Sequence, residues 1–466
     1  MHSQELLNYF HQNRIADGNF FPLNDIGMAG LFYHVYQMQF CYVVETSCYY
    51  AFNGRHWVKD VKNLGIKEKS KVFALSLEQY GKEIHSEMIE KIGKGLTSLK
   101  KRESLVNDST SINPMKFCVF DSNKYLFNCQ NGTLDLETGN FRPHSPVDYI
   151  TKLSNVNYNP EVCCLRWESF IGEVMQNDPD CMRFLQKTFG YALTGDTSHE
   201  CFFIFYGSTT RNGKSTCCET ISHLMGDYAR NVQPETLSKS KKNGSNPSPD
   251  VARLQGIRLA VTPEPEKGLE LNVSLMKQLT GGDKLTSRFL NENPIEFTPE
   301  FKIIMNTNHQ PRISDDTVFS SHRVKLIPFE RHFSEEEQDK NLKNHFREPE
   351  NLSGIFNWML QGYRLMKQEG FQQTGKLLEA VEEYREESDI LGNFVRDCLS
   401  VSENNRLPTK RVYTIYDMWA KDSGYRPMSL KNLVAEMKKR YDVRRDSGGN
   451  VLIGFDFVAE YKRWFY

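Results

Sequence analysis

The residues best suited to chemistry form one run in the middle of the chain, residues 201–216. An apolar segment of strand length, residues 202–206, leads into a loop that contains two glycines, and residues 218–225 have the pattern of a helix. This order suits phosphate binding, because backbone N–H groups and the positive end of the helix converge on one point. The sequence therefore predicts a polyphosphate site.

Lys214, Ser215 and Thr216 stand where this loop meets the expected helix. In such an arrangement Lys214 reaches the β- and γ-phosphates of a nucleotide, and the Ser215 hydroxyl holds Mg²⁺. The loop glycines, Gly207 and Gly213, enclose five residues where the usual motif has four. We keep the prediction because Gly207 only shapes the turn, and the alternative is a glycine-bearing turn with a surface lysine.

Two later segments are expected to be core strands that end in polar side chains. Residues 258–262 lead to Glu264 and Glu266, and an acid at the end of a strand beside the phosphate-loop strand orients Mg²⁺ and polarises the attacking water. Residues 301–305 lead to Asn308, whose neutral amide can hold that water against the γ-phosphate. The alternative for the two glutamates is a solvated loop.

Composition limits the classes of protein to consider. The chain has 466 residues, enough for about three domains, and a net charge of −1, so any nucleic-acid surface must be local. The eleven cysteines include no Cys-x-x-Cys motif, no apolar run approaches membrane-spanning length and no signal peptide is visible. We expect reduced thiols, no membrane contact and a location in the cytoplasm, most simply that of a bacterial host.

Five motifs occur in the order found in superfamily 3 helicases. They are residues 212–215, residues 264–266, residues 275–283 with Arg288 five places on, Asn308, and residues 323–329. The chain resembles the helicase part of the phage and plasmid primase-helicase family, which includes the poxvirus primase-helicase, most strongly over residues 160–335. No primase motif is visible in the first 150 residues.

The resemblance implies a role for each matching residue. Gly207, Asn212, Gly213, Lys214, Ser215 and Thr216 would bind ATP. Ser215 and Glu264 would hold Mg²⁺, with Glu266 as the neighbouring candidate acid, and Asn308 matches the sensor asparagine. Arg323 matches the arginine that, in family hexamers, reaches into the neighbouring subunit's ATP site and stabilises the developing charge. Arg312 is a less expected substitute for it.

The resemblance also places a pore-lining hairpin between the acidic motif and the sensor strand. Residues 285–290 and 295–297 read as its strands and residues 291–294 as its turn. Lys284 and Arg288 would then face the channel and contact DNA phosphates. The alternative is that Arg288 is a structural residue paired with Asp283.

The C-terminal segment is locally basic. Residues 406–466 contain thirteen lysines and arginines against seven aspartates and glutamates. Helical patterns at 412–421 and 430–441, followed by a β-like turn at 446–450, suggest a winged-helix module. Its DNA-contacting residues would be Lys438, Lys439, Arg440, Arg444 and Arg445. The alternative is a basic solvated helix in a small packing domain.

These observations predict an α/β fold: an AAA+-like P-loop motor domain with a mixed α+β N-terminal domain and a C-terminal winged-helix-like domain. The expected boundaries are 1–155 for the N-terminal domain, 156–200 for a helical collar used in oligomerisation, 201–335 for the ATPase, 336–404 for a helical lid or linker and 405–466 for the DNA-binding domain.

The function we expect is that of an ATP-dependent DNA helicase of a phage, plasmid or other mobile element. It would form a ring, most simply a hexamer, and translocate 3′ to 5′ on single-stranded and forked DNA. Its further partners would be other replication proteins, with a separate primase where priming is needed. One alternative is an ATP-switched replication initiator that melts an origin without processive unwinding. Another is a nucleotide-dependent structural or defence protein whose ring holds DNA without moving.

Overall fold

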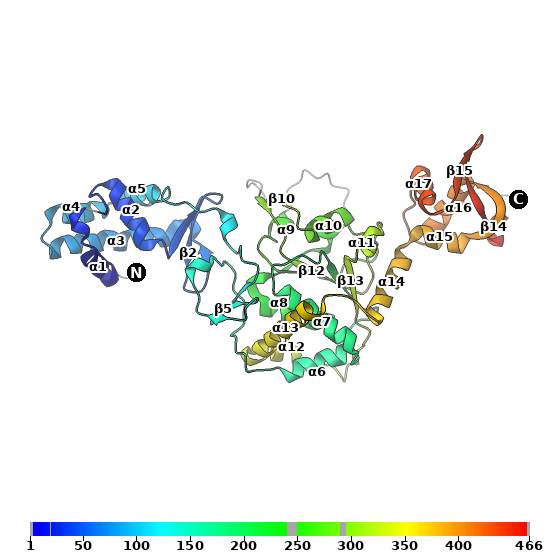
Figure 1. The fold of residues 1–466 in the computed structure, drawn as a ribbon, viewed down its shortest axis with the longest axis horizontal. Coiled ribbons are helices and arrows are strands. Elements are labelled where there is room, and N and C mark those ends of the chain that lie inside the picture. Colours follow the sequence, from blue (N-terminus) through cyan, green and yellow to red (C-terminus); the bar gives the residue numbers. More distant parts are fainter. Residues whose placement is uncertain (1–2, 19, 240–248, 289–294, 464–466) are drawn as a thin grey trace.

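A computed structural model of the chain describes residues 3–18, 20–239, 249–288 and 295–463. Within these ranges three units follow one another along the long axis of the molecule, with the two termini at opposite ends (Figure 1). Residues 240–248, and residues 289–294 at the expected hairpin tip, lie outside the described residues.

The N-terminal unit packs helices against a small antiparallel sheet of order β1-β2-β3. The turn at Asn53 and Gly54 joins β2 to β3. Residues 76–105 span parts of three helices that share one apolar core with α1 and α2. The elements are α1 (Ser3–Gln12), α2 (Asp25–Tyr36), β1 (Phe40–Val43), β2 (Cys48–Phe52), β3 (Trp57–Lys59), α3 (Leu64–Glu83), α4 (Glu87–Leu96) and α5 (Leu99–Ser109).

A second small sheet belongs to the central unit by its packing. It consists of β4 (Leu126–Cys129), β5 (Gly132–Asp135) and β6 (Phe141–Arg142), paired antiparallel. The ring of Phe127 stacks on Tyr228 at 4.8 Å and on Phe356 at 5.0 Å between ring centroids. Residues before the expected boundary at 155 are therefore part of the central hydrophobic core.

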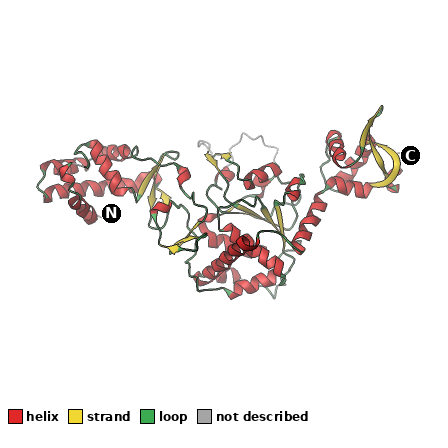
Figure 2. Cartoon of the chain, viewed as in Figure 1, coloured by secondary structure: helices red, strands yellow, loops and turns green. Residues whose placement is uncertain are grey.

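The central unit is a five-stranded parallel sheet of order β13-β7-β12-β9-β8, with helices against it (Figure 2). The strands are β7 (Phe202–Tyr206), β8 (Ala229–Asn231), β9 (Leu259–Thr262), β12 (Lys302–Thr307) and β13 (Val324–Pro328). The expectation that the Glu264 strand lies beside the phosphate-loop strand is wrong, because β12 lies between them. Apolar runs identify strands, but crossover connections decide their order in the sheet.

The helices of the central unit include two that precede β7, within the expected helical collar at 156–200. Asp178 caps the second of these by accepting a hydrogen bond from the Cys181 N–H, and Pro179 occupies its first turn. The elements are α6 (Leu165–Val174), α7 (Pro179–Ala192), α8 (Lys214–Met225), α9 (Pro249–Ala252), α10 (Val273–Thr280), α11 (Thr317–Ser320), α12 (Leu342–Phe346), α13 (Pro349–Glu369) and α14 (Lys376–Ser388), with the hairpin strands β10 (Leu285–Ser287) and β11 (Ile295–Phe297).

The C-terminal unit has its own apolar core and an antiparallel sheet of order β14-β16-β15. Its elements are α15 (Ile390–Cys398), β14 (Leu399–Pro408), α16 (Thr409–Asp422), α17 (Leu430–Arg440), β15 (Val443–Asp446), β16 (Gly449–Phe457) and α18 (Ala459–Lys462). Because β14 pairs with β16 from Leu399 onward, the expected boundary at 405 falls inside a strand of this unit.

Candidate active site

Two glycines shape the loop between β7 and α8. Gly213 has a φ of +85°, and a Cβ atom there would lie 2.5 Å from Cγ2 of Val174. A Cβ atom on Gly207 would lie 2.4 Å from the carbonyl oxygen of Phe329. Larger side chains do not fit at either position. Gly207 thus has a steric role in spite of its unusual spacing from Gly213.

Asn212 stabilises this loop through a hydrogen bond within it. Its side chain is buried, and its Nδ2 donates a hydrogen bond of 2.6 Å to the carbonyl of Thr209. The segment after β13 supports the loop from outside, because the Phe333 N–H donates to the Arg211 carbonyl at 2.9 Å. The Asn212 amide, which the sequence places among the nucleotide-binding groups, is therefore engaged within the loop itself.

Lys214 begins α8 and joins it to the end of β12. Its buried Nζ donates hydrogen bonds to Oδ1 of Asn308 at 2.7 Å and to the carbonyl of Gly207 at 3.2 Å. Burial lowers the pKa of Lys214 to about 8, and the charge of Glu264 acts in the opposite direction. The structure thus brings together a lysine, an amide and an acid that are far apart in the sequence.

The hydroxyl groups of Ser215 and Thr216 lie in the first turn of α8. Ser215 is exposed and Thr216 is partly buried. The amino end of a helix carries partial positive charge and free N–H groups, so anions are stabilised there. The first turn of α8 therefore combines a hydroxyl ligand with a place for phosphates.

The acidic candidates follow β9 on the same edge of the sheet. Glu264 and Glu266 are both exposed, while Pro265 between them is buried. Glu264 is the one whose charge acts on Lys214. Just before them, the buried hydroxyl of Thr262 has no hydrogen-bond partner among the described residues.

These groups fit Mg²⁺ and a triphosphate. A hydroxyl and a carboxylate are oxygen ligands of the kind that Mg²⁺ prefers, and the glycine-shaped loop leaves its backbone open to phosphate oxygens. In the part of the chain that the structure describes, no cluster of three or more His, Cys, Asp or Glu side chains forms a metal site by itself. Ser215 and Glu264 are thus the residues best suited to hold the ion together with phosphate oxygens.

Arg323 lies at the opposite edge of the sheet from the phosphate loop. Its carbonyl accepts a hydrogen bond of 2.9 Å from the N–H of Phe202, the first residue of β7, whereas the loop follows the last. A strand of this length spans about 13 Å. The guanidinium donates to Oγ1 of Thr280 at 3.0 Å and pairs with the Glu200 carboxylate. The structure therefore does not bring Arg323 to its own subunit's loop.

The predicted hairpin at 285–297 has two paired strands, with Thr286 opposite Glu296. Lys284 and Arg288 are exposed, as is Glu296. Among the described residues no ion pair joins Arg288 to Asp283. The contact expected if Arg288 were a structural residue is therefore not present. Both basic residues are accessible to a ligand on this side of the unit.

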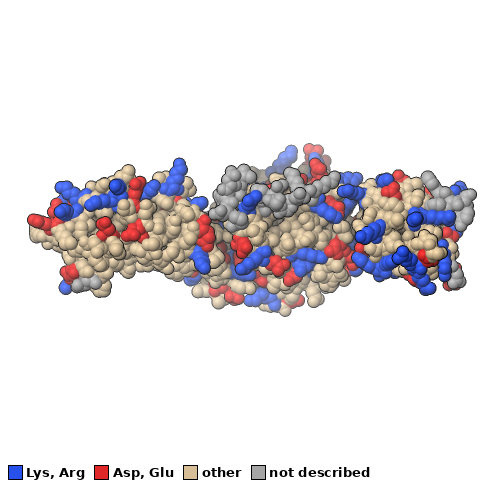
Figure 3. Space-filling model, turned by 90° about the horizontal axis from the view of Figure 1, so that it is seen from above, with Lys and Arg blue, Asp and Glu red and all other residues tan. Residues whose placement is uncertain are grey.

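The basic residues of the C-terminal unit fall into two groups. Lys and Arg side chains gather on the face of this unit seen in Figure 3. Arg440 is paired with Asp389, Arg444 with Asp442 at 2.7 Å and Lys439 with Glu436 at 2.6 Å. Lys438 and Arg445 are exposed and make no ion pair within the described ranges.

Sequence reasoning missed two buried cations, Arg258 and Lys302, at the edge of the sheet away from the phosphate loop. Arg258 donates to the carbonyls of Leu193 at 2.6 Å and Leu126 at 2.7 Å. Lys302, on the adjacent strand, donates to the carbonyl of Asp196 at 2.9 Å, and its burial lowers its pKa to about 7. A basic residue at the start of an otherwise apolar strand is the signal that could have revealed them, and both fasten the sheet to its neighbours.

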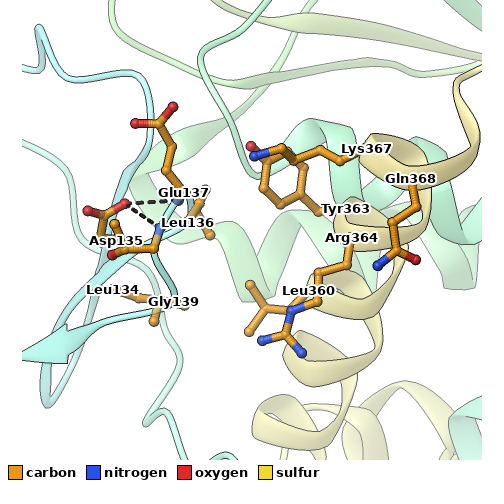
Figure 4. A pocket seen from close by; sticks show the side chains of 11 residues that line it. Leu134, Asp135, Leu136, Glu137, Gly139, Leu360, Tyr363, Arg364, Lys367 and Gln368 are labelled. Carbon is orange, nitrogen blue, oxygen red and sulfur yellow. Dashed lines mark hydrogen bonds between the residues drawn. The ribbon is translucent and has the colours of Figure 1, made fainter.

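A cavity of about 320 Å³ lies away from these groups, between the turn after β5 and α13. Figure 4 shows Asp135 and Glu137 on one wall and Arg364 and Lys367 on the other. Asp135 is engaged in its own turn, where its Oδ1 accepts from the Glu137 N–H at 2.9 Å. No residue of the phosphate loop lines this cavity, and we assign no chemistry to it.

None of the described helices has the length and apolar character needed to cross a membrane. The eleven cysteines are free thiols, and nine of them are buried. Burial raises the pKa of several of these thiols, including Cys201 and Cys218, to about 12. Most of the cysteines are therefore core residues, as expected.

Three known families match separate parts of the chain. The D5 N terminal like family matches residues 29–176, a family of unknown function matches residues 205–323, and the poxvirus D5 protein-like family matches residues 386–461. Among solved structures, the apo C-terminal region of NrS-1 (305–718) is 11% identical, with a TM-score of 0.49 over 93% of this chain and 100% of that one.

Curated relatives come from large DNA viruses. "Putative helicase L207/L206" of Acanthamoeba polyphaga mimivirus is 30% identical over 64% of this chain. "Putative helicase 121R" of Invertebrate iridescent virus 3 is 24% identical over 65%, and "Putative primase C962R" of African swine fever virus is 22% identical over 64%. The chain spans about a third of the length of these relatives (32%, 35% and 33%).

The two D5-type matches lie on either side of Lys214 in the sequence, and the relatives are named as putative helicases and primases. The expected resemblance to the primase-helicase family is therefore confirmed. The chain thus carries matches to the D5 N terminal like and poxvirus D5 protein-like families, and it is similar to proteins of large DNA viruses that are named as putative helicases and primases.

Proposed function

We propose that the chain is an ATP-dependent DNA helicase of superfamily 3. The observation that carries this proposal is the contact between Lys214 and Asn308 at the carboxyl edge of a parallel sheet, with Glu264 close enough to influence the lysine. Ligands of open α/β sheets bind outside the carboxyl ends of the strands. The helicase names of the viral relatives supply the biological context.

Hydrolysis of ATP to ADP and phosphate would use these residues in separate roles. The α8 amino end and Lys214 bind the phosphates, and Asn308 and Glu264 orient and polarise the attacking water. Mg²⁺, held by Ser215 and Glu264, would neutralise charge on the phosphate oxygens. Catalysis of phosphoryl transfer depends mainly on such positioning and charge stabilisation, and little on covalent chemistry by the protein.

We further propose that the active form is a ring, most simply a hexamer. Arg323 lies at the edge of the sheet remote from its own phosphate loop, which suits a residue that completes the site of a neighbouring subunit. To do so it has to leave its pair with Glu200, which is half exposed. Translocation in the 3′ to 5′ direction belongs to this proposal through the family resemblance.

The C-terminal unit would contact DNA as a winged helix. The element order α15-β14-α16-α17-β15-β16 and the sheet order β14-β16-β15 suit that module, with the β15–β16 turn as the wing. Lys438 at the end of α17 and Arg445 on β15 are the accessible phosphate contacts. Lys284 and Arg288 of the hairpin would contact the single strand in the central channel.

Strand displacement on a synthetic forked duplex tests this function. Wild-type protein with ATP should release the labelled strand, Lys214→Ala should not, and Lys343→Ala, which removes an exposed ion pair with Glu219, should behave like the wild type. An initiator that melts DNA without processive unwinding would open a short bubble but leave the long fork intact. That result would favour the alternative function.

A further inference from the structure

Residues 308–317, which follow β12, connect the candidate nucleotide site to both candidate DNA-contacting elements. We call them the junction segment. It begins at Asn308, which accepts the hydrogen bond from Lys214, and it ends at Thr317, the first residue of α11. Any displacement of Asn308 therefore shifts the first residue of this short segment.

One set of contacts leads from the junction segment toward the hairpin. Lys277 of α10 donates to Oδ2 of Asp315 at 2.8 Å and to Oγ1 of Thr317 at 2.5 Å. Burial raises the pKa of Asp315, but hydrogen bonds from Lys277 and Thr317 outweigh it and hold the pKa at about 2. Since α10 ends at Thr280 and β10 begins at Leu285, the segment is tied to the helix that precedes the hairpin.

A second set leads to the C-terminal unit. Nη2 of Arg312 donates a hydrogen bond of 2.7 Å to the carbonyl of Gly424, and its guanidinium lies 5.0 Å from the ring centroid of Tyr425. Gly424 and Tyr425 follow α16. The backbone of Arg312 is fixed at the same time, because its N–H donates to the Leu269 carbonyl at 2.7 Å.

The helix that leads to the C-terminal unit holds the same segment from the side. Arg385 of α14 forms a bidentate pair with Asp316, with N–O distances of 2.7 Å and 2.9 Å. The hydroxyl of Tyr384, also on α14, donates to the carbonyl of Pro311. Figure 1 shows α14 running from the central unit toward the C-terminal unit.

A segment fixed in this way transmits displacement, because a change at Asn308 has to shift or break contacts farther along it. Coupling between two sites is a free energy that acts in both directions. Binding of DNA by the C-terminal unit would therefore bias the position of Asn308, and the state of the nucleotide would bias the C-terminal unit.

We propose that Arg312 is a positioning residue that couples the nucleotide site to the C-terminal unit through its contact with Gly424 and Tyr425. This inference rests on the proposed function, since it concerns how DNA accelerates ATP hydrolysis. Arg312 touches neither the phosphate loop nor the accessible basic residues of α17 and β15. Its loss should leave both binding sites intact and break only their communication.

The experiment compares the full chain with Arg312→Ala, Arg312→Lys and the control Arg396→Ala. Within the described ranges, the Arg396 side chain forms polar contacts with Asn393 and Asp397 of its own helix and with no other residue. The readouts are kcat and KM for ATP with and without oligo-dT, the Kd for fluorescent oligo-dT, and hydrogen exchange at residues 423–428 with and without a non-hydrolysable ATP analogue. The thermal midpoint of each variant shows whether it is folded.

Arg312→Ala should keep its DNA-free kcat and KM and its Kd for oligo-dT within about two-fold. It should lose about five-fold or more of the stimulation of kcat by DNA, and the nucleotide-dependent change in exchange at 423–428 should disappear. Arg312→Lys should recover part of the DNA stimulation and part of the exchange change, because lysine keeps the charge but not the planar guanidinium that lies against the Tyr425 ring. The control should match the wild type.

Unchanged stimulation and unchanged exchange in Arg312→Ala would overturn the inference. So would a loss of DNA-free hydrolysis as large as that of Lys214→Ala in a folded variant, because Arg312 would then belong to the site itself. If Arg312→Ala fails to fold, the same criteria apply to Tyr425→Ala. A wild type that hydrolyses no ATP, with or without DNA, would contradict the proposed function, and the coupling would fall with it.

Discussion

The Nζ atom of Lys214 lies 2.7 Å from Oδ1 of Asn308, so the first residue of α8 and the end of β12 meet in one hydrogen bond. The two residues are separated by 94 positions in the chain. Their contact places a positive charge and a neutral amide at the same point outside the sheet.

Replacing the amide should slow the chemical step more than it weakens nucleotide binding. Asn308→Ala should lower kcat about 100-fold, the size expected when one positioned polar group is removed from a transition state, with a smaller change in KM. Asn306→Ala is the matched control, because in the part of the chain that the structure describes its Oδ1 accepts a single weak hydrogen bond, of 3.3 Å from the Cys218 thiol. Equal losses of kcat in both variants would contradict the assignment.

Nucleotide binding should depend on pH through Lys214. Its pKa of about 8 means that the lysine is largely charged at pH 7 and loses its proton as the pH rises through 8. Phosphates favour the charged form, so binding above pH 8 takes up a proton, and the Kd for ATP should rise by up to about ten-fold per pH unit.

Titration calorimetry at pH 7, 8 and 9 measures this effect, and Lys214→Arg provides the control. An arginine keeps its charge throughout this range, so the variant should show a much weaker pH dependence. A wild-type affinity that stays constant from pH 7 to 9 would contradict a phosphate-binding lysine with a pKa near 8.

Arg323 should act on a neighbouring subunit. Arg323→Ala and Lys214→Ala should each lack ATP hydrolysis, and a mixture of the two should recover part of it, since some interfaces then combine an intact loop with an intact arginine. Glu200→Gln should keep activity, because it weakens only the pair that holds Arg323 in place. Absence of recovery in rings shown to exchange subunits would count against the assignment.

The two groups of basic residues in the C-terminal unit should behave differently. Lys438→Ala and Arg445→Ala should each weaken binding to DNA. Each should also reduce the slope of log K against the logarithm of the salt concentration by about one, because one phosphate contact is lost. Arg440→Ala should instead lower the free energy of unfolding by about 0.5–1 kcal/mol, the range for a partly exposed ion pair, because it pairs with Asp389.

Fluorescence anisotropy at several salt concentrations and denaturant unfolding separate these effects. Lys438→Ala and Arg445→Ala should weaken DNA binding without lowering stability. Arg440→Ala should lower stability without weakening DNA binding. If Arg440→Ala weakened DNA binding as strongly as Lys438→Ala while leaving stability unchanged, Arg440 would have to be a DNA contact.

The sequence allowed the local features of the site to be predicted. An apolar run before Gly207, the residues after Gly213 and the amide at the end of the 301–305 run each depend on neighbours within a few positions, so their elements appear as expected. The order of the strands could not be predicted, because placing β12 between β7 and β9 depends on crossover connections.

Long-range pairs were equally inaccessible. Arg440 and Asp389 are 51 positions apart, and nothing near Arg440 distinguishes it from Lys438 until the fold brings Asp389 to it. Phe127 was expected in the N-terminal domain, yet its ring packs between Tyr228 and Phe356 of the central unit. Such contacts follow from tertiary packing, which local patterns do not contain.

The most direct test of the central claim is the rate of ATP hydrolysis by the purified chain, measured with and without single-stranded DNA, for the wild type, Lys214→Ala and Lys343→Ala. We predict hydrolysis that DNA accelerates in the wild type and in Lys343→Ala, and none above background in Lys214→Ala. Hydrolysis by Lys214→Ala at the wild-type rate, or a wild type that hydrolyses no ATP even with DNA present, would contradict the assignment of this site.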